Sequence, residues 1–336
     1  MKTILYIGNK LAKHGINQTS IETLGEFLER EGFQLFYASE KKNKVLRMLD
    51  MIFKTLYYSK KADYVLIDTY STYNFWYALI ISQLCRILNL KYIPKLHGGD
   101  LPKRLQNNPK LCQLIFANSY LNIAPSSYLL DAFREKGFTK TIYVPNTIEL
   151  IKYEFKKREI IEPKLLWVRS FSMIYNPEMA IHVLNQLKNE FPNAELCMVG
   201  PDHNGNLNKM QQLAKQLNLN VKFTGRLSKE EWVELSKEYD IFINTTHFDN
   251  TPVSVIEAMA LGLPVVSTNV GGIPYLLENN KTALLVNDDD VFQMVESIKK
   301  IIEDKVLKNY IVENALNLVQ DFDSEKVKLD WFKILK

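Results

Sequence analysis

The chain has 336 residues, of which 46% are hydrophobic and 24% are charged, and these averages exclude a disordered, collagen-like or coiled-coil protein. The formal net charge of +4 conceals an asymmetry: residues 1–150 contain 20 Lys and Arg against 12 Asp and Glu, whereas residues 151–336 contain 22 against 26. The length favours two domains over one, and three scattered cysteines, Cys85, Cys112 and Cys197, favour a reducing compartment, which we expect to be the cytoplasm.

The first half of the chain alternates short β-like runs with amphipathic helical segments. This alternation predicts parallel α/β units with right-handed crossovers. The apolar run at the N-terminus is short and is not followed by a small-residue cleavage site, so we interpret it as a strand and not as a signal peptide. The expected strands are Thr3–Ile7, Gln34–Ala38, Tyr64–Ile67, Tyr92–Lys95, Leu121–Ala124 and Ile142–Val144, and the expected helices are Gln18–Arg30, Lys44–Tyr58, Tyr73–Leu88 and Ser127–Lys136.

The segment Lys41–Lys61 combines a high density of Lys and Arg with apolar residues at helical spacing. It permits two interpretations: an ordinary surface helix with one stripe facing the core, or a basic amphipathic helix that contacts an anionic membrane surface. The longest apolar stretch, Phe75–Ile81, is far shorter than the ~20 residues that cross a bilayer. We expect no membrane-spanning segment and no nucleic-acid partner.

A second α/β series follows a charged stretch, Ile148–Pro163, which we interpret as a linker. The expected strands are Leu165–Val168, Glu195–Val199, Val221–Phe223, Ile241–Asn244, Pro264–Ser267 and Ala283–Val286, and the expected helices are Pro177–Asn189, Leu207–Gln216, Lys229–Glu238, Val253–Leu261 and Val291–Ile302. The last segment, Ser324–Lys336, places Val327, Trp331, Phe332 and Leu335 on one helical face. We therefore predict domains at 1–150 and 151–323, with a C-terminal helix at 324–336 that returns to the first domain.

The run from Thr245 to Val266 is the most informative part of the sequence. Open α/β sheets bind ligands beyond the carboxyl ends of their strands, and Asp249 follows a predicted strand and precedes a predicted helix. The free N–H groups at that helix start favour an anionic or hydroxyl-rich ligand, and Glu257 within the helix could accept hydrogen bonds from a diol. The alternative is that Asp249 caps the helix and Glu257 occupies a solvated helical position.

Asp249 and Glu257, followed by Ala258-Met259-Ala260-Leu261-Gly262-Leu263-Pro264-Val265-Val266, resemble the signature of the family-4 retaining glycosyltransferases of GT-B architecture. The segments Val144-Pro145-Asn146, Val199-Gly200, Phe223-Thr224-Gly225-Arg226-Leu227 and Gly271-Gly272-Ile273-Pro274 also occur in the order that is usual in this family. The resemblance implies an α/β fold with two Rossmann-like domains whose parallel sheets face each other across a cleft. It covers the second half densely and the first half thinly.

The resemblance also implies residue roles in binding a nucleotide-diphosphate sugar. Glu257 would hold the ribose, Asp249 the donor sugar, and Arg169 the diphosphate, where a fixed cation stabilises the leaving group. The full set of expected donor-binding residues is Gly15, Arg169, Gly200, Arg226, Leu227, His247, Asp249, Asn250, Thr251, Pro252, Val253 and Glu257. In the first half, His97 with Gly98 and Asp100 would bind the acceptor, and His97, Arg169, Asp249 and Glu257 form the expected catalytic set.

The sequence departs from the family pattern in two places. Tyr175-Asn176 stands where a lysine and a glycine are expected after Arg169, so one phosphate contact loses its charge. Asp249 replaces the commoner glutamate, and its shorter reach changes which sugar hydroxyls it can contact.

We therefore expect a metal-independent, cofactor-free retaining glycosyltransferase. It would move a hexose or N-acetylhexosamine from a UDP-sugar to a glycan or lipid-linked acceptor in surface polysaccharide synthesis, in the cytoplasm or at the inner face of the membrane. The alternatives are a nucleotide-sugar isomerase on a similar fold and a non-catalytic nucleotide-sugar-binding subunit. The sequence contains no G-x-G-x-x-G or P-loop motif, which weighs against a dinucleotide dehydrogenase or an NTPase.

Overall fold

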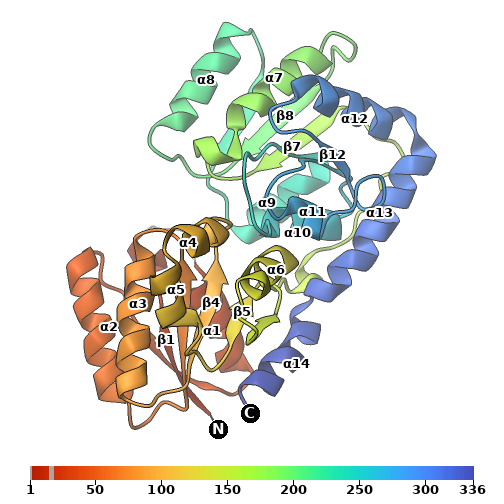
Figure 1. The fold of residues 1–336 in the computed structure, drawn as a ribbon. Coiled ribbons are helices and arrows are strands. Elements are labelled where there is room, and N and C mark those ends of the chain that lie inside the picture. Colours follow the sequence, from red (N-terminus) through yellow and green to blue (C-terminus); the bar gives the residue numbers. More distant parts are fainter. Residues whose placement is uncertain (1, 15–18) are drawn as a thin grey trace. The chain divides into compact units, whose positions relative to one another are not determined.

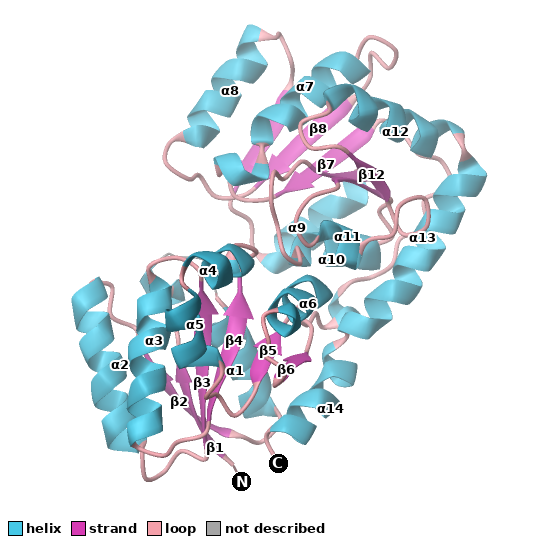
Figure 2. Cartoon of the chain, in the orientation of Figure 1, coloured by secondary structure: helices cyan, strands magenta, loops and turns pink. Residues whose placement is uncertain are grey.

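The structure, a computed structural model, describes residues 2–14 and 19–336 and divides the chain into two compact units. The first unit contains the described residues up to Pro145 together with Lys328–Lys336, and the second contains Asn146–Val327. Figure 1 follows the chain by colour through both units, and Figure 2 separates helices from strands. Each unit is an α/β structure and is described by itself.

The first unit is built on a six-stranded parallel sheet with strand order β2-β1-β3-β4-β5-β6. Its strands are β1 (Thr3–Ile7), β2 (Gln34–Ala38), β3 (Tyr64–Tyr70), β4 (Tyr92–His97), β5 (Asn122–Ala124) and β6 (Thr141–Tyr143). Its helices are α1 (Ser20–Arg30), α2 (Lys44–Tyr58), α3 (Asn74–Ile87), α4 (Leu101–Asn107), α5 (Pro109–Phe116) and α6 (Ser127–Glu135), and α14 (Ser324–Ile334) enters the unit at Lys328.

Both faces of this sheet are covered by helices, as parallel sheets require. Leu5 and Ile7 of β1 pack in one core cluster with Met51 of α2 and Phe75 of α3. At the C-terminus, the Tyr64 phenol donates a 2.9 Å hydrogen bond to the carbonyl oxygen of Lys336, which ties the end of the chain to β3.

The second unit is also a six-stranded parallel sheet, with strand order β12-β11-β10-β7-β8-β9. Its strands are β7 (Lys164–Val168), β8 (Glu195–Val199), β9 (Val221–Gly225), β10 (Ile241–Asn244), β11 (Val265–Thr268) and β12 (Leu284–Val286). Its helices are α7 (Pro177–Leu187), α8 (Asn206–Gln216), α9 (Lys229–Leu235), α10 (Val253–Ala260), α11 (Ile273–Leu276), α12 (Val291–Glu303) and α13 (Lys305–Val319).

Successive residues of β7 show that both faces of the second sheet are buried. Leu165 and Trp167 belong to one hydrophobic cluster, whereas Leu166 and Val168 pack in another. Side chains alternate between the two faces of a strand, so a continuous apolar run such as Leu165–Val168 is what a doubly covered parallel strand needs.

The structure adds helices that were not predicted, among them the four-residue α11, and it extends several strands. Helices α4 and α5 lie in a segment for which no helix was predicted, and each begins with a proline in its first turn. Helix α13 was also missed, although Ile311, Ala315 and Val319 recur at a four-residue spacing and are buried. Strands β3, β4 and β9 each extend two or three residues beyond the predicted ends.

The charged stretch 148–163 is not a free linker, because it is anchored to the second unit. Arg158 is 5% exposed, and its guanidinium donates hydrogen bonds of 2.9–3.0 Å to the carbonyl oxygens of Ser236, Tyr239 and Leu261. Burial lowers the pKa of Arg158 to about 10, which leaves it charged at neutral pH. The segment therefore has a fixed position on this unit.

None of the helices formed by residues 2–14 and 19–336 is long and apolar enough to cross a membrane.

Candidate functional site

In the second sheet, the direction in which the chain adds strands reverses between β7 and β10. The chain proceeds from β7 to β8 and β9 on one side, and from β10 to β11 and β12 on the other. Such a switch point leaves a crevice beyond the carboxyl ends of the two central strands, where α/β sheets bind ligands. Arg169 directly follows β7, and the loop 245–252 directly follows β10.

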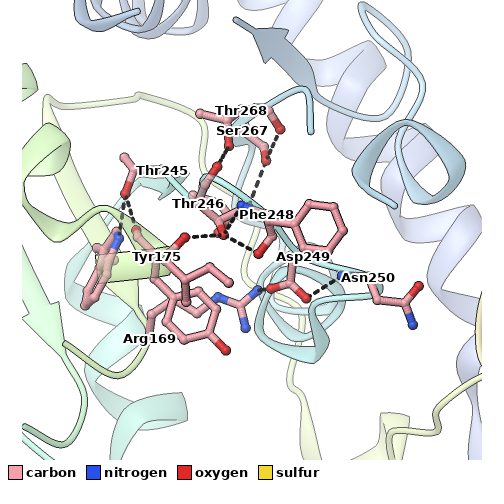
Figure 3. A network of polar contacts seen from close by, with 12 residues as sticks. Arg169, Tyr175, Thr245, Thr246, Phe248, Asp249, Asn250, Ser267 and Thr268 are labelled. Carbon is pink, nitrogen blue, oxygen red and sulfur yellow. Dashed lines mark hydrogen bonds and ion pairs between the residues drawn. The ribbon is translucent and has the colours of Figure 1, made fainter. Parts of the chain in front are cut away.

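Arg169 and Asp249 form an ion pair at this switch point (Figure 3). Nη2 of Arg169 donates a 2.6 Å hydrogen bond to Oδ2 of Asp249, and the two side chains are only 14% and 17% exposed. The Nε of Arg169 is buried and has no hydrogen-bond partner among the described residues. The guanidinium therefore holds Asp249 in place and keeps a donor for a further anionic group.

Tyr175 and Asn176, which depart from the family pattern, have separate structural roles. The ring centroid of Tyr175 lies 5.0 Å from the guanidinium carbon of Arg169, a cation–π contact. Burial raises the pKa of Tyr175, so its phenol remains protonated and can donate a hydrogen bond. Asn176 has the left-handed backbone conformation (φ 45°, ψ 59°) that glycine would supply, and its side chain caps α7. The asparagine thus replaces the expected glycine without loss of the local fold.

The loop that carries Asp249 is fixed from two sides. The hydroxyl of Thr246 lies 3.0 Å from the carbonyl oxygen of Ile174, and the Gly272 N–H donates a 2.8 Å bond to the Asp249 carbonyl. A Cβ on Gly272 would lie 2.1 Å from the carbonyl oxygen of Asn250, so a side chain cannot be accommodated there. The Gly271-Gly272 pair permits this close backbone approach.

Helix α10 begins directly after this loop, and its first turn is buried. Asn250 is 6% exposed and Thr251 is 9% exposed, and Pro252 and Val253 continue into the helix. The hydroxyls of Thr251 and Ser254 are buried and have no hydrogen-bond partner among the described residues. Together with the first backbone N–H groups of the helix, they provide donors for the oxygens of a ligand.

Glu257 is buried in α10, with 3% exposure, so the interpretation of this residue as a solvated helical position is wrong. Its Oε1 accepts a 2.7 Å hydrogen bond from the phenol of Tyr153 and also contacts Nζ of Lys229. Burial, and then the charge of Glu257, raise the pKa of Tyr153. Oε2 of Glu257 has no hydrogen-bond partner within the described part of the chain, so this oxygen can accept a hydrogen bond from a diol.

The other expected donor-binding residues of this unit lie around the same sheet edge. Gly200 follows β8, and a Cβ there would lie 1.7 Å from the Arg169 carbonyl oxygen. Arg226 and Leu227 follow β9; Arg226 is exposed, and Leu227 packs partly against the core. His247 is 40% exposed, and its Nδ1 lies 2.9 Å from Oδ1 of Asp288. These contacts do not bring His247 to the Arg169–Asp249 pair.

Gly15, also expected to bind the donor, lies outside the described residues.

In the first unit, His97 ends β4 and contacts Asp68 of β3. Nε2 of His97 is 2.8 Å from Oδ1 of Asp68, and the ring of Tyr70 stacks on the imidazole at 4.7 Å. Burial lowers the pKa of His97, against the opposing effect of Asp68. The imidazole is therefore oriented by a carboxylate, and burial favours its neutral form.

Asp68 is the centre of a buried polar cluster at the carboxyl end of this sheet. Its Oδ1 also accepts a 3.0 Å hydrogen bond from Tyr6, and its Oδ2 is buried without a partner among residues 2–14 and 19–336. Lys95 donates a 2.7 Å bond to the Ser20 hydroxyl, and burial lowers the pKa of Lys95 to about 8. A Cβ on Gly8 would lie 2.7 Å from Asp68 Oδ2, so a side chain at this position would displace the carboxylate.

The other expected acceptor-binding residues follow His97. Gly98 is exposed with φ +75°, and Asp100 precedes α4 and is exposed. Asp100 borders a small polar pocket of about 210 Å³ that is also lined by Ser71, Thr72, Lys103, Arg104, Asn107 and Asn108.

Asp68, Tyr153 and Lys229 were not predicted from the sequence as site residues. Asp68 could have been found, because it is a charged residue directly after the apolar run that we predicted as a strand. Tyr153 lies in the stretch interpreted as a linker, and no spacing in the sequence connects it with Glu257. Within the described residues, no group of three or more His, Cys, Asp or Glu side chains is placed to hold a metal ion.

Comparison with known proteins gives a family match and a fold match. Residues 152–318 match the family described as glycosyl transferases group 1. This glycosyl transferases group 1 segment contains both Arg169 and Glu257. HepE from Anabaena, solved in complex with UDP and glucose, is 19% identical, with a TM-score of 0.78 over 100% of this chain and 99% of that one. The chain has the GT-B fold.

Two curated relatives are similar over longer stretches than the group 1 segment. N-acetyl-alpha-D-glucosaminyl L-malate synthase of Bacillus anthracis is 24% identical over 256 residues, which is 71% of this chain and 65% of that protein. The UDP-Gal:alpha-D-GlcNAc-diphosphoundecaprenol alpha-1,3-galactosyltransferase of Escherichia coli is 25% identical over 214 residues, which is 56% and 53%. In three curated relatives the matched part makes up 28%, 37% and 65% of their length, so the chain spans less than two thirds of each.

Proposed function

We propose that the chain is a retaining glycosyltransferase that moves a hexose or N-acetylhexosamine from a UDP-sugar to a glycan or lipid-linked acceptor. The observation that carries this proposal is the Arg169–Asp249 pair at the switch point of the second sheet, directly before the buried first turn of α10. The UDP bound by HepE and the UDP-galactose named for the E. coli relative support the choice of donor.

The leaving group of such a transfer is a nucleoside diphosphate, which gains negative charge as the glycosidic bond breaks. Arg169 supplies a fixed cation, with a spare Nε donor, and the N-terminus of α10 adds backbone N–H groups. In this proposal these groups stabilise the departing diphosphate, and no metal or cofactor takes part. Tyr175 adds a neutral phenol donor beside Arg169 in place of a second cation.

The two ends of the donor would be recognised by the two carboxylates. Glu257 presents Oε2 to the ribose hydroxyls, while Tyr153 and Lys229 hold Oε1. Asp249 would accept hydrogen bonds from the sugar hydroxyls, and its orientation is set by Arg169. A carboxylate that accepts from two neighbouring hydroxyls is a common way to select a diol.

The first unit would bind the acceptor. His97, oriented by Asp68, can hydrogen-bond the attacking hydroxyl, and the basic balance of residues 1–150 suits an acceptor that carries phosphate. The diphosphate-linked acceptor in the name of the E. coli relative supports this acceptor class. We extend the proposal to a role in surface polysaccharide synthesis.

Thermal unfolding with UDP, GDP, ADP, CMP and their sugar conjugates tests the donor site. A ligand at 100 times its dissociation constant adds about 2.7 kcal/mol to the free energy of unfolding. We expect a UDP-sugar to stabilise the wild type and Glu313→Gln, an exposed matched control, but not Glu257→Gln. Equal stabilisation of all three proteins would remove the assigned role of Glu257.

Turnover separates the three functions. Transfer to an added acceptor, with the anomeric configuration of the donor kept in the product as read by NMR, supports the proposal. A product formed from donor alone indicates an isomerase. Donor binding without turnover across a panel of glycan and lipid-diphosphate acceptors indicates a binding subunit, and an inverted product contradicts retention.

A further inference from the structure

Helix α2 is apolar on the face that points away from the first unit. Arg47, Met51 and Thr55 are buried and face the core. Leu46, Leu49, Phe53, Leu56 and Tyr57 lie about half a turn away around the helix and are 48–64% exposed. We call these five residues the α2 outer face. Because the outer face of an ordinary surface helix is polar, the apolar composition of the α2 outer face is unusual.

Helix α3 continues the apolar surface. It contacts α2, and both helices cover the same core cluster, so they lie on one face of the first sheet (Figure 1). Trp76, Ile80 and Ile87 are 43%, 40% and 77% exposed and recur at helical spacing on the outer side of α3. Exposed apolar side chains on two adjoining helices are typical of an interaction site.

Lysines flank the α2 outer face at both ends. Lys41, Lys42 and Lys44 precede or begin the helix, Lys60 and Lys61 follow it, and all five are exposed. Within the described residues none of the five forms a salt bridge. Residues 41–91 contain nine Lys and Arg against three Asp, so the whole region is basic.

We propose that the outer faces of α2 and α3 bind to an anionic lipid membrane. An amphipathic helix that lies in the membrane interface combines an apolar face, which enters the acyl boundary, with lysines that contact anionic headgroups. Trp76 and Tyr57 suit the same boundary, because their rings are apolar and carry one polar atom.

A second copy of the chain fits this surface less well. Packing two α2 outer faces together would place the lysine clusters of the two copies near each other in either orientation, because both ends of the helix are basic. Like charges brought together oppose association, whereas an anionic surface attracts them. Charge complementarity therefore selects the membrane. This inference does not depend on the proposed sugar transfer.

Co-sedimentation with vesicles tests the proposal. We expect the full chain to bind vesicles of 30% phosphatidylglycerol in phosphatidylcholine, and to bind pure phosphatidylcholine at least tenfold more weakly. The double variant Leu49→Glu/Phe53→Glu should lose at least tenfold in binding. A matched control, Ile151→Glu/Val306→Glu, changes two residues of the second unit that are 96% and 80% exposed and should bind like the wild type.

Trp76 gives an independent readout. The other three tryptophans, Trp167, Trp232 and Trp331, are at most 4% exposed, so of the four it is the one that reports on the surface. Insertion should shift the emission to shorter wavelength, and brominated lipids should quench it, in the wild type but not in Trp76→Phe.

Three outcomes would overturn the proposal. One is unchanged vesicle binding by Leu49→Glu/Phe53→Glu. Another is that the wild type does not bind anionic vesicles, while sedimentation velocity shows that it is a dimer and that Leu49→Glu/Phe53→Glu is a monomer. The third concerns the charge variant Lys60→Glu/Lys61→Glu, which is used if the apolar variant does not fold. If this charge variant binds anionic vesicles as tightly as the wild type at low salt, the membrane contact is refuted.

Discussion

The phenol of Tyr153 donates a 2.7 Å hydrogen bond to Oε1 of Glu257, although the two residues are 104 positions apart. Tyr153 is 8% exposed and Glu257 is 3% exposed. The bond is made from the stretch that connects the two sheets along the chain, and Lys229 of α9 contacts the same oxygen. Two elements outside α10 thus hold one oxygen of this carboxylate in place.

Tyr153→Phe should lower both stability and donor affinity. A hydrogen bond to a buried charged group contributes about 1.5–3 kcal/mol, so the variant should lose about 2 kcal/mol in free energy of unfolding, measured by urea denaturation. Stabilisation by a UDP-sugar should fall as well, because Glu257 loses its orientation. Tyr310→Phe, on the exposed side of α13, is the control and should change neither quantity. Equal values for Tyr153→Phe and the wild type would show that Lys229 alone holds Glu257.

Arg169→Lys should separate charge from geometry. Lysine keeps the positive charge but cannot bond Asp249 and a phosphate oxygen from one planar group, and it loses the flat contact with Tyr175. We expect kcat to fall by roughly 100-fold, because leaving-group stabilisation depends on a fixed donor. Donor binding, followed by thermal shift, should weaken much less. A kcat within twofold of the wild type would mean that charge suffices and that the planar geometry has no role in the transfer.

Gly272→Ala should destabilise the second unit for a steric reason alone. Gly272 has an ordinary φ of −86°, so the obstacle is the carbonyl oxygen of Asn250, which lies 2.1 Å from the position that a Cβ would occupy. We expect a loss of about 3 kcal/mol in free energy of unfolding. Gly32→Ala is the control: its φ is +88° and no atom lies within 4 Å of a Cβ, so backbone strain of about 1 kcal/mol is expected. Similar losses in both variants would contradict the steric account.

The fold was largely predictable from the sequence, because parallel strands buried on both faces leave continuous apolar runs. Leu165–Val168 and Ile241–Asn244 were predicted within one residue of β7 and β10 for this reason. Helix α13 was missed because its polar residues outnumber the buried Ile311, Ala315 and Val319 that define its packed face. Helices α4 and α5 are short, and the intervening Asn108 breaks their periodicity.

The candidate site was predictable only where the contacts are local in the sequence. Asp249 and Glu257 lie on one strand–loop–helix unit, so their spacing already places them at the same sheet edge. The ion pair of Asp249 with Arg169 forms because β7 and β10 are neighbours in the sheet. The sequences of these two strands do not reveal that they are neighbours. Tyr153 does not belong to a strand–loop–helix unit, and its position depends on how residues 148–163 pack.

Lys95 provides a test of the buried polar cluster in the first unit. Lys95 is 4% exposed, its ammonium donates a hydrogen bond to Ser20, and burial lowers its pKa from 10.5 to about 8. Between these two values the unfolded chain binds a proton that the folded chain has released, so the free energy of unfolding rises with pH across this window. Below pH 8 both states are protonated, and the full cost of burying the charge is present.

Lys95→Met removes this pH dependence. The difference in free energy of unfolding, wild type minus Lys95→Met, should increase by about 3 kcal/mol between pH 7 and pH 10.5, because each pKa unit corresponds to 1.36 kcal/mol. Urea denaturation at half-unit pH steps measures it, and other groups that titrate in this range cancel in the difference. The exposed Lys110→Met is the control and should give a flat difference. A flat difference for Lys95→Met would show that Ser20 and Asp68 compensate the burial of the charge in full, and that Lys95 retains its ordinary pKa in the cluster that orients His97.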